Sequence, residues 1–163
     1  MAEHVRIGIG SDIHRLVPGR PLIIGGVTIE SDLGADGHSD ADVLQHAVTD
    51  ALLGALAMGD IGKHFPDSTE EWKDANSSIL LAKVIKLVKW HNYEVVNVDS
   101  TIHLEAPKLQ QTLEEMRDLL AKLLQIDRNQ VSIKAKTGES VDAVGRREAV
   151  RAEAVVLLRK ADT

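Results

Sequence analysis

The chain has 163 residues, of which 44% are hydrophobic, and a formal net charge of −6 at pH 7. This length suits a single domain, 1–163, and the acidic balance argues against a general nucleic-acid-binding protein. Cysteine is absent, which excludes disulfides and thiolate ligands, so any metal must be bound by histidine and carboxylate. A strand-like pattern close to Met1 and the lack of an apolar run of ~20 residues predict no signal peptide, no membrane segment and a cytoplasmic location.

The N-terminal part predicts short strands. Val5–Gly10 alternates as a strand does, and residues 22–29 read as two short strands joined at Gly25-Gly26, the pattern of a β-hairpin. Residues 31–37 are polar and contain glycine, so we expect a loop there.

A first helix is predicted from Ser39 or Asp40 to about Met58, with Asp42 in a capping-box-like position three residues after Ser39. Asp42, His46 and Asp50 recur every four residues and form one polar stripe. Such a stripe must face either water or a binding site.

The rest of the chain is predicted to contain both helices and strands. Residues 60–67 predict a loop, and the elements expected after it are helices over 79–90 and 109–124 and strands over 95–104, 131–136 and 148–159. The last segment has good helix formers, but its alternation favours a strand over a helix. The order predicts an α+β two-layer sandwich: a mixed four-stranded sheet with helices on one face, plus a small β-hairpin. The uncovered face would then be buried in an oligomer.

Asp12, His14 and His46 are candidate metal ligands. Asp12 and His14 are two residues apart, so an extended chain projects both to one side. Zinc in catalytic sites takes three nitrogen or oxygen ligands and keeps a fourth position open. The spacing alone favours a hydrogen-bonded surface pair over a metal site.

Two other polar segments have both a functional and an ordinary interpretation. His38-Ser39 could bind an anion at the start of the first helix, or Ser39 could only cap that helix. Asp60, Gly62 and Asp67 could position substrate hydroxyls, or form an ordinary polar loop.

A further polar region lies near the end of the 131–136 strand. Its lysines and Thr137 could contact a phosphate while Glu139 binds a divalent cation, or the region could be a solvated strand end. The lysines are Lys108, Lys134 and Lys136. Arg146 belongs to what is most often a surface charge cluster.

Taken together, these segments resemble the 2-C-methyl-D-erythritol 2,4-cyclodiphosphate synthases of the non-mevalonate isoprenoid pathway. The resemblance runs over nearly the whole chain, and its most specific block is 38–67. The matching motifs are RIGxGxDxH at 6–14, IIGGV at 23–27, HSDxDVxxHAxTDALLGA at 38–55, GDIGKxFPD at 59–67, NVDxTI at 97–102, APK at 106–108 and GR at 145–146.

The resemblance implies a homotrimer whose sheets face a threefold axis, with active sites between subunits. It implies a lyase-type intramolecular phosphoryl transfer that converts 4-diphosphocytidyl-2-C-methyl-D-erythritol 2-phosphate to the 2,4-cyclodiphosphate and CMP, without a covalent enzyme intermediate. It also implies one Zn²⁺ per subunit and a Mg²⁺ or Mn²⁺ ion bridging the substrate phosphates.

The same resemblance implies a role for each matching residue. Asp12, His14 and His46 would bind zinc, and Glu139 the second cation; Asp12 and His14 would also lie against the substrate. Catalytic roles fall to His38, Asp42 and Thr137, with Asp42 beside the metal-binding helix face. His38 and Ser39 would contact the diphosphate, and Asp60, Gly62 and Asp67 the methylerythritol part. The cytidine would be bound by Ala106, Pro107, Lys108 and Leu109. The remaining substrate contacts would come from Lys136, Thr137, Glu139 and Arg146.

The chain departs from the family pattern at several positions. Lys136-Thr137-Gly138 stands where consecutive threonines are common, so a phosphate contact here would be ionic. Ser11 and Asp142-Ala143 replace aromatic-containing segments that line an axial cavity in the family. Two competing functions remain open at this point: a metal-dependent phosphohydrolase, and a non-catalytic trimeric metal- or nucleotide-binding module.

Overall fold

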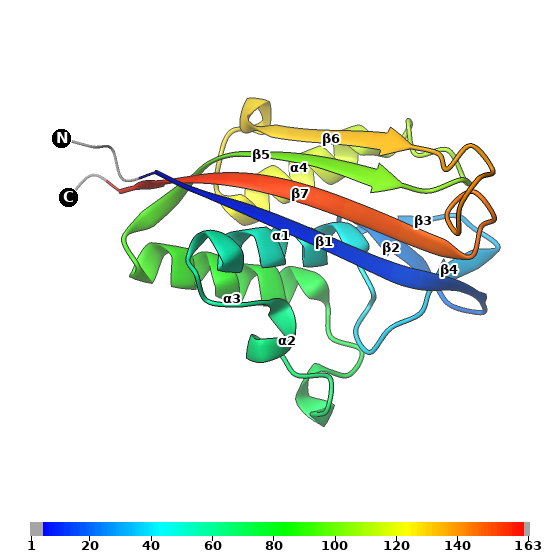
Figure 1. Ribbon diagram of the computed structural model, residues 1–163, viewed down its shortest axis with the longest axis horizontal. Helices are drawn as coiled ribbons and strands as arrows, with labels where there is room; N and C mark the ends of the chain where they lie inside the picture. Colours follow the sequence, from blue (N-terminus) through cyan, green and yellow to red (C-terminus); the bar gives the residue numbers. More distant parts are fainter. Residues whose placement is uncertain (1–4, 162–163) are drawn as a thin grey trace.

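The computed structural model describes residues 5–161 of the chain (Figure 1). The strands are β1 (Val5–Pro18), β2 (Leu22–Ile24), β3 (Val27–Ile29), β4 (Leu33–Ala35), β5 (Tyr93–His103), β6 (Val131–Lys136) and β7 (Ala149–Lys160). The α-helices are α1 (Val43–Ala55), α2 (Ile61–His64), α3 (Ser77–Trp90) and α4 (Leu113–Leu124), with short 3₁₀ turns at Glu70–Trp72 and Arg128–Gln130.

The strands form a mixed five-stranded sheet and a separate two-stranded one. Among residues 5–161, the large sheet has the order β4-β1-β7-β5-β6, in which only the β5–β6 pair is parallel. The β2–β3 hairpin turns at Gly25 and Gly26, as the sequence predicts. In Figure 1, β1 and β7 pass in front of α1, and α4 lies behind β5 and β6. The α+β prediction is therefore confirmed.

The predicted strand number was wrong, since the large sheet has five strands rather than four. The additional strand is β4, which pairs with the far end of β1 through Leu16↔Ala35 and Pro18↔Leu33. This pairing exists because β1 continues to Pro18 instead of ending at Gly10. A three-residue strand has too little alternation to stand out from a polar loop.

Two glycines on β1 allow α1 to lie directly against the sheet. A Cβ atom at Gly8 would lie 1.8 Å from the carbonyl oxygen of Ala51, and one at Gly10 would lie 2.0 Å from that of Ala47. Both atoms belong to the helix backbone, which cannot rotate away as a side chain can. Glycine on this face of β1 is therefore a packing requirement, and it sets the distance between β1 and α1.

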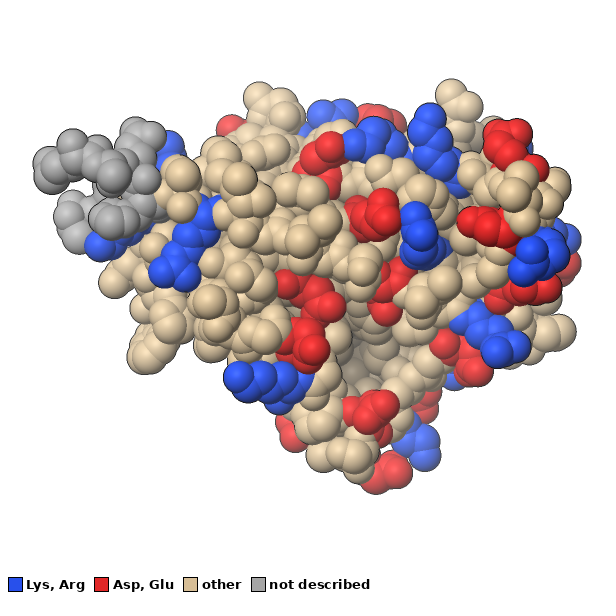
Figure 2. All heavy atoms as spheres, in the orientation of Figure 1, with Lys and Arg blue, Asp and Glu red and all other residues tan. Residues whose placement is uncertain are grey.

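The opposite face of the sheet is left uncovered in the chain as described. Its apolar side chains on β1 are strongly exposed, with Ile7 at 71% and Ile9 at 74%. Figure 2 shows this face, with a mostly uncharged area in its left half, bordered by a few basic side chains, and interspersed acidic and basic side chains toward the right. An exposed aliphatic surface of this kind is typical of a contact between subunits.

Among residues 5–161, no helix is both long enough and apolar enough to cross a membrane.

Candidate active site

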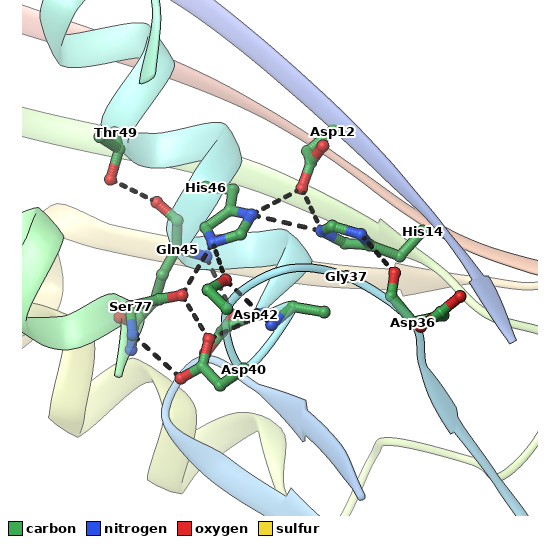
Figure 3. Close-up of polar contacts among 12 residues, drawn as sticks. Asp12, His14, Asp36, Gly37, Asp40, Asp42, Gln45, His46, Thr49 and Ser77 are labelled. Carbon is green, nitrogen blue, oxygen red and sulfur yellow. Dashed lines mark hydrogen bonds and ion pairs between the residues drawn. The ribbon is translucent and has the colours of Figure 1, made fainter. Parts of the chain in front are cut away.

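Asp12, His14 and His46 meet in space (Figure 3). Asp12 and His14 lie on the α1-facing side of β1, and His46 is the fourth residue of α1. The Asp12 Oδ2 atom is 2.8 Å from His14 Nε2 and 3.0 Å from His46 Nδ1, and the two nitrogens are 3.3 Å apart. The three side chains are mostly buried, with exposed fractions of 26% for Asp12, 15% for His14 and 12% for His46. One oxygen and two nitrogens thus converge as metal ligands do.

The ring of His14 is fixed from its other side. Its Nδ1 lies 3.0 Å from the carbonyl oxygen of Asp36. A carbonyl oxygen only accepts hydrogen bonds, so Nδ1 carries the hydrogen and the lone pair of the neutral ring is on Nε2, facing Asp12 and His46. An outer hydrogen bond of this kind is a regular feature of metal-binding histidines.

The electrostatics of this cluster favour a cation. Burial by itself would raise the pKa of Asp12, but hydrogen bonds and charge interactions with His14 and His46 lower it to about 2. Burial by itself would lower the pKa of His46, but the hydrogen bond to Asp12 and the nearby carboxylates raise it above its usual range. Asp12 is therefore ionised at any ordinary pH, and the cluster attracts positive charge.

The cluster opens into a pocket of about 390 Å³. Its lining includes the residues predicted for the diphosphate, His38 and Ser39, and two of those predicted for the methylerythritol part, Gly62 and Asp67. The pocket thus brings most of the 38–67 block to one place. It is also lined by side chains for which the sequence predicted no functional role, among them Phe65, Trp72 and Leu80.

Phe65 and Trp72 give this pocket an aromatic wall. Their rings are in edge contact, with centroids 5.1 Å apart, and the Lys83 ammonium lies 4.2 Å from the Trp72 ring centroid. Trp72 is the last residue of the 3₁₀ turn at Glu70–Trp72. Its position in the pocket depends on the turn after α2, which has no helical or strand periodicity in the sequence.

The start of α1 differs from the prediction. The helix begins at Val43, and its N-cap is Asp42 rather than Ser39, whose hydroxyl instead accepts from the Ala41 amide at 3.2 Å. The prediction that the helix starts at Ser39 or Asp40 was therefore wrong. The reason is the Asp42 carboxylate, which accepts the Gln45 amide within the helix and also holds a distant part of the chain.

Asp42 fixes the β2–β3 hairpin to α1. Its carboxylate accepts hydrogen bonds from the amides of Gly25 at 2.9 Å and Gly26 at 2.7 Å, in addition to that of Gln45 at 3.0 Å. The side chain is fully buried. Burial raises its pKa to about 6, although the three amides favour the ionised form. These contacts are structural, and the catalytic role implied for Asp42 stays a prediction.

Replacing Asp42 by asparagine is expected to lower the free energy of unfolding by about 1–3 kcal/mol. The asparagine oxygen can still accept the hydrogen bonds from the Gly25 and Gln45 amides. Its NH₂ group then faces the Gly26 amide, so two hydrogen-bond donors meet in a buried position. Urea unfolding followed by circular dichroism measures the change. Asp50→Asn is the matched control, because Asp50 accepts one amide, that of Ile61, which an asparagine oxygen can also accept. Equal losses in the two variants would contradict this account of Asp42.

Asp60 also has a local structural role. It is the N-cap of the short helix α2 and accepts the Lys63 amide at 3.0 Å. The segment 60–67 is therefore partly helical, where a loop was predicted. Asp60 does not line the 390 Å³ pocket, but the residues that follow it, Ile61 and Gly62, do.

The residues predicted for cytidine and the second cation form a separate group. Pro107, Lys108, Leu109, Lys136 and Thr137 line another pocket of about 450 Å³, and Ala106 lines a neighbouring one with Pro107. The Thr137 hydroxyl donates to Glu139 at 3.0 Å. Within the described part of the chain, this second pocket shares no lining residue with the first.

Arg146 lies outside both of these pockets. Its guanidinium forms an ion pair with Glu148 at 3.1 Å, and both side chains are more than half exposed. The substrate contact implied for Arg146 stays a prediction.

Comparisons with known proteins agree with this geometry. A model of the YgbB family matches residues 5–159. A relative from Geobacillus kaustophilus (strain HTA426), named 2-C-methyl-D-erythritol 2,4-cyclodiphosphate synthase, is 56% identical over 155 residues, which cover 95% of this chain and 98% of the relative.

Solved structures give the same result. A CDP-bound form of a protein of that name superposes with a TM-score of 0.87 at 38% identity, covering 94% of this chain and 99% of that chain. A CDP complex from Plasmodium falciparum superposes with a TM-score of 0.87 at 32% identity, covering 99% of this chain and 100% of that chain. The resemblance found in the sequence is confirmed, and the chain belongs to the YgbB family.

Proposed function

We propose that this chain is a 2-C-methyl-D-erythritol 2,4-cyclodiphosphate synthase, which converts 4-diphosphocytidyl-2-C-methyl-D-erythritol 2-phosphate to the cyclic diphosphate and CMP. The observation that supports this most is the pocket in which Asp12, His14 and His46 converge beside His38 and Ser39. High identity to relatives that carry this name over nearly their whole length supports the same reaction.

The metal centre fits zinc. Asp12 Oδ2, His14 Nε2 and His46 Nδ1 provide one oxygen and two nitrogens, the ligand types that zinc takes in catalytic sites. The outer hydrogen bond from His14 Nδ1 to the Asp36 carbonyl places a hydrogen on Nδ1 and leaves Nε2 as the ligand nitrogen. Zinc bound there would act as a Lewis acid on phosphate oxygens and hold them in position. Glu139 is the proposed ligand of a second cation, Mg²⁺ or Mn²⁺.

The protein's own side chains would bind and orient a substrate that already contains both reacting groups. The 2-phosphate attacks the β-phosphorus, a bond to the leaving CMP breaks, and an eight-membered ring closes. Nucleophile and electrophile lie in one molecule, so holding them close accounts for most of the rate gain, and no nucleophilic side chain is needed. His38 and Ser39 would hold the diphosphate, and Gly62 and Asp67 the methylerythritol part.

The active site is proposed to be completed by a second copy of the chain in a homotrimer. Ala106 to Leu109, Lys136 and Thr137, proposed to receive the cytidine and phosphate groups, lie in pockets separate from the metal centre. The uncovered sheet face, with exposed Ile7, Ile9 and Ile13, offers the apolar surface for assembly about a threefold axis. A neighbouring subunit would bring the second group of residues to the first.

The products distinguish this function from its competitors. With substrate, zinc and magnesium, phosphorus NMR should show the cyclic diphosphate and CMP formed in equal amounts. A phosphohydrolase would give inorganic phosphate or a linear product, and a binding module would bind cytidine nucleotides without turnover. Linear products alone would exclude the synthase.

A further inference from the structure

The ring of His46 is held from the side opposite the metal centre. Its Nε2 lies 2.8 Å from the hydroxyl of Ser77 and 3.2 Å from that of Ser39. Ser77 is the first residue of α3 and is 1% exposed. Figure 3 shows its side chain between His46 and Asp40. A buried hydroxyl at the outer nitrogen of a metal-binding histidine can fix the orientation of the ring.

Asp40 determines the direction of these hydrogen bonds. Its carboxylate contacts the Ser77 hydroxyl through Oδ1 and accepts the Ser77 amide through Oδ2 at 2.9 Å. An ionised carboxylate only accepts hydrogen bonds, so the hydroxyl hydrogen of Ser77 points to Asp40. The oxygen of Ser77 then has only lone pairs to offer His46. The hydrogen in that bond must therefore come from His46 Nε2.

This direction has a consequence at the other ring nitrogen. A metal binds the neutral imidazole, which carries one hydrogen, so in the metal-bound state a hydrogen on Nε2 leaves the lone pair on Nδ1. Nδ1 is the atom that faces Asp12 Oδ2 at 3.0 Å and His14 Nε2 at 3.3 Å. The chain of bonds from Asp40 through Ser77 thus prepares the nitrogen that would bind a metal.

We propose that Asp40 and Ser77 are positioning residues for the metal centre. Asp40 orients the Ser77 hydroxyl, and Ser77 holds His46 with Nε2 protonated and Nδ1 directed at the metal. This inference rests on the metal site of the proposed function and extends it to two residues that do not themselves converge on the metal. It also makes the start of α3 a support for the active site, since Ser77 comes from that helix.

Ser39 limits the loss of zinc affinity that is expected when the Ser77 hydroxyl is removed. Its hydroxyl already accepts the Ala41 amide at 3.2 Å and lies farther from His46 Nε2 than Ser77 does. When the Ser77 hydroxyl is removed, the Ser39 hydroxyl can still accept a weaker hydrogen bond from His46 Nε2. The loss of zinc affinity should then fall near the lower end of the roughly 10–100-fold range seen when such supporting contacts are removed.

Ser77→Ala is the sharpest test, because it removes the hydroxyl and keeps the amide that binds Asp40. Zinc affinity measured by competition with a chelator should fall about tenfold. In zinc-loaded protein with ¹⁵N-labelled histidine, NMR should show a hydrogen on Nε2 of His46 in the wild type, and faster solvent exchange of that hydrogen in the variant. An unchanged zinc affinity together with unchanged exchange would overturn the proposal.

Ser78→Ala is the matched control in the same helical turn. The Ser78 hydroxyl accepts from Gln45 Nε2 at 3.0 Å, so its loss disturbs packing between α1 and α3 and leaves the His46 bond in place. Zinc affinity in this variant should stay at the wild-type value. An equal loss of affinity in both variants would mean that Ser77 acts only through helix packing, against the proposal.

The wild-type protein gives a test that does not depend on any variant folding. In the zinc-loaded wild type, a hydrogen on Nδ1 of His46 instead of Nε2 would overturn the proposal directly. If the wild type binds no zinc at the three-residue cluster, the proposed metal site fails as well. If it binds zinc, and Ser77→Ala binds zinc equally well with unchanged exchange of the His46 hydrogen, only the role of Asp40 and Ser77 fails.

Discussion

Replacing His46 by alanine is expected to remove both zinc binding and turnover. The change deletes one of three converging ligands and leaves Asp12 and His14, two neighbours on one strand, which cannot surround an ion. Lewis-acid stabilisation of a phosphoryl-transfer transition state is worth several kcal/mol. At 1.36 kcal/mol per factor of ten, the rate should fall by about 10³-fold or more. Metal analysis after gel filtration and a CMP-release assay measure the two effects on one preparation.

The fold should survive this change, because the His46 ring contacts polar groups at the site rather than the apolar core. Circular dichroism and the oligomeric state should match those of the wild type. His91→Ala is a matched control, since His91 lies beyond the end of α3 and its ring packs against exposed Trp90. It should keep zinc and activity. Full turnover in metal-free His46→Ala would contradict the assignment of the metal centre.

Replacing Gly10 by alanine is expected to damage the fold and the site together. The new Cβ would lie 2.0 Å from the Ala47 carbonyl oxygen and 2.6 Å from the Ala51 amide nitrogen, both in the backbone of α1. Overpacking against side chains typically costs about 1–3 kcal/mol. A backbone contact relaxes less, so the loss of unfolding free energy should reach about 3 kcal/mol or more. Urea unfolding measures it.

The same substitution should weaken zinc binding. To relieve the clash, α1 must move away from β1, which separates His46 from Asp12 and His14. Gly54→Ala is the control within α1, because the nearest atom to its added Cβ is the Ile9 oxygen at 3.7 Å. Alanine in a helix is favoured over glycine by about 1 kcal/mol, so this variant should be as stable as the wild type or more so. Similar losses in Gly10→Ala and Gly54→Ala would contradict the close packing of β1 and α1.

Elements with a clear local pattern could be predicted from the sequence. The hairpin at Gly25-Gly26 and the strand over 131–136 were placed correctly, because alternation and turn glycines are local signals. The strand at 149–160 was favoured for the same reason, although its residues are good helix formers. The start of α1 was misplaced because Asp42 bonds to Gly25 and Gly26, 17 and 16 residues away, and no local pattern indicates such a contact.

The sequence indicated individual residues of the candidate site better than it indicated how they are arranged in space. Asp12 and His14 were expected on one side of an extended chain, and β1 does continue through both. The residue types made His46 a candidate partner of Asp12 and His14, but no local pattern showed that the three meet. His46 lies 34 residues from Asp12 and reaches it because glycines let α1 approach β1. Ser77 had no signal of its own beyond helix capping. Its contact with His46 exists only once α3 packs beside α1.

The most direct test is a zinc titration of metal-stripped protein with turnover measured at each step. If Asp12, His14 and His46 form the reaction centre, CMP release should rise in proportion to bound zinc and reach its maximum at one zinc per subunit, with magnesium and substrate held constant. Substantial CMP release and cyclic product from protein without zinc would contradict this account.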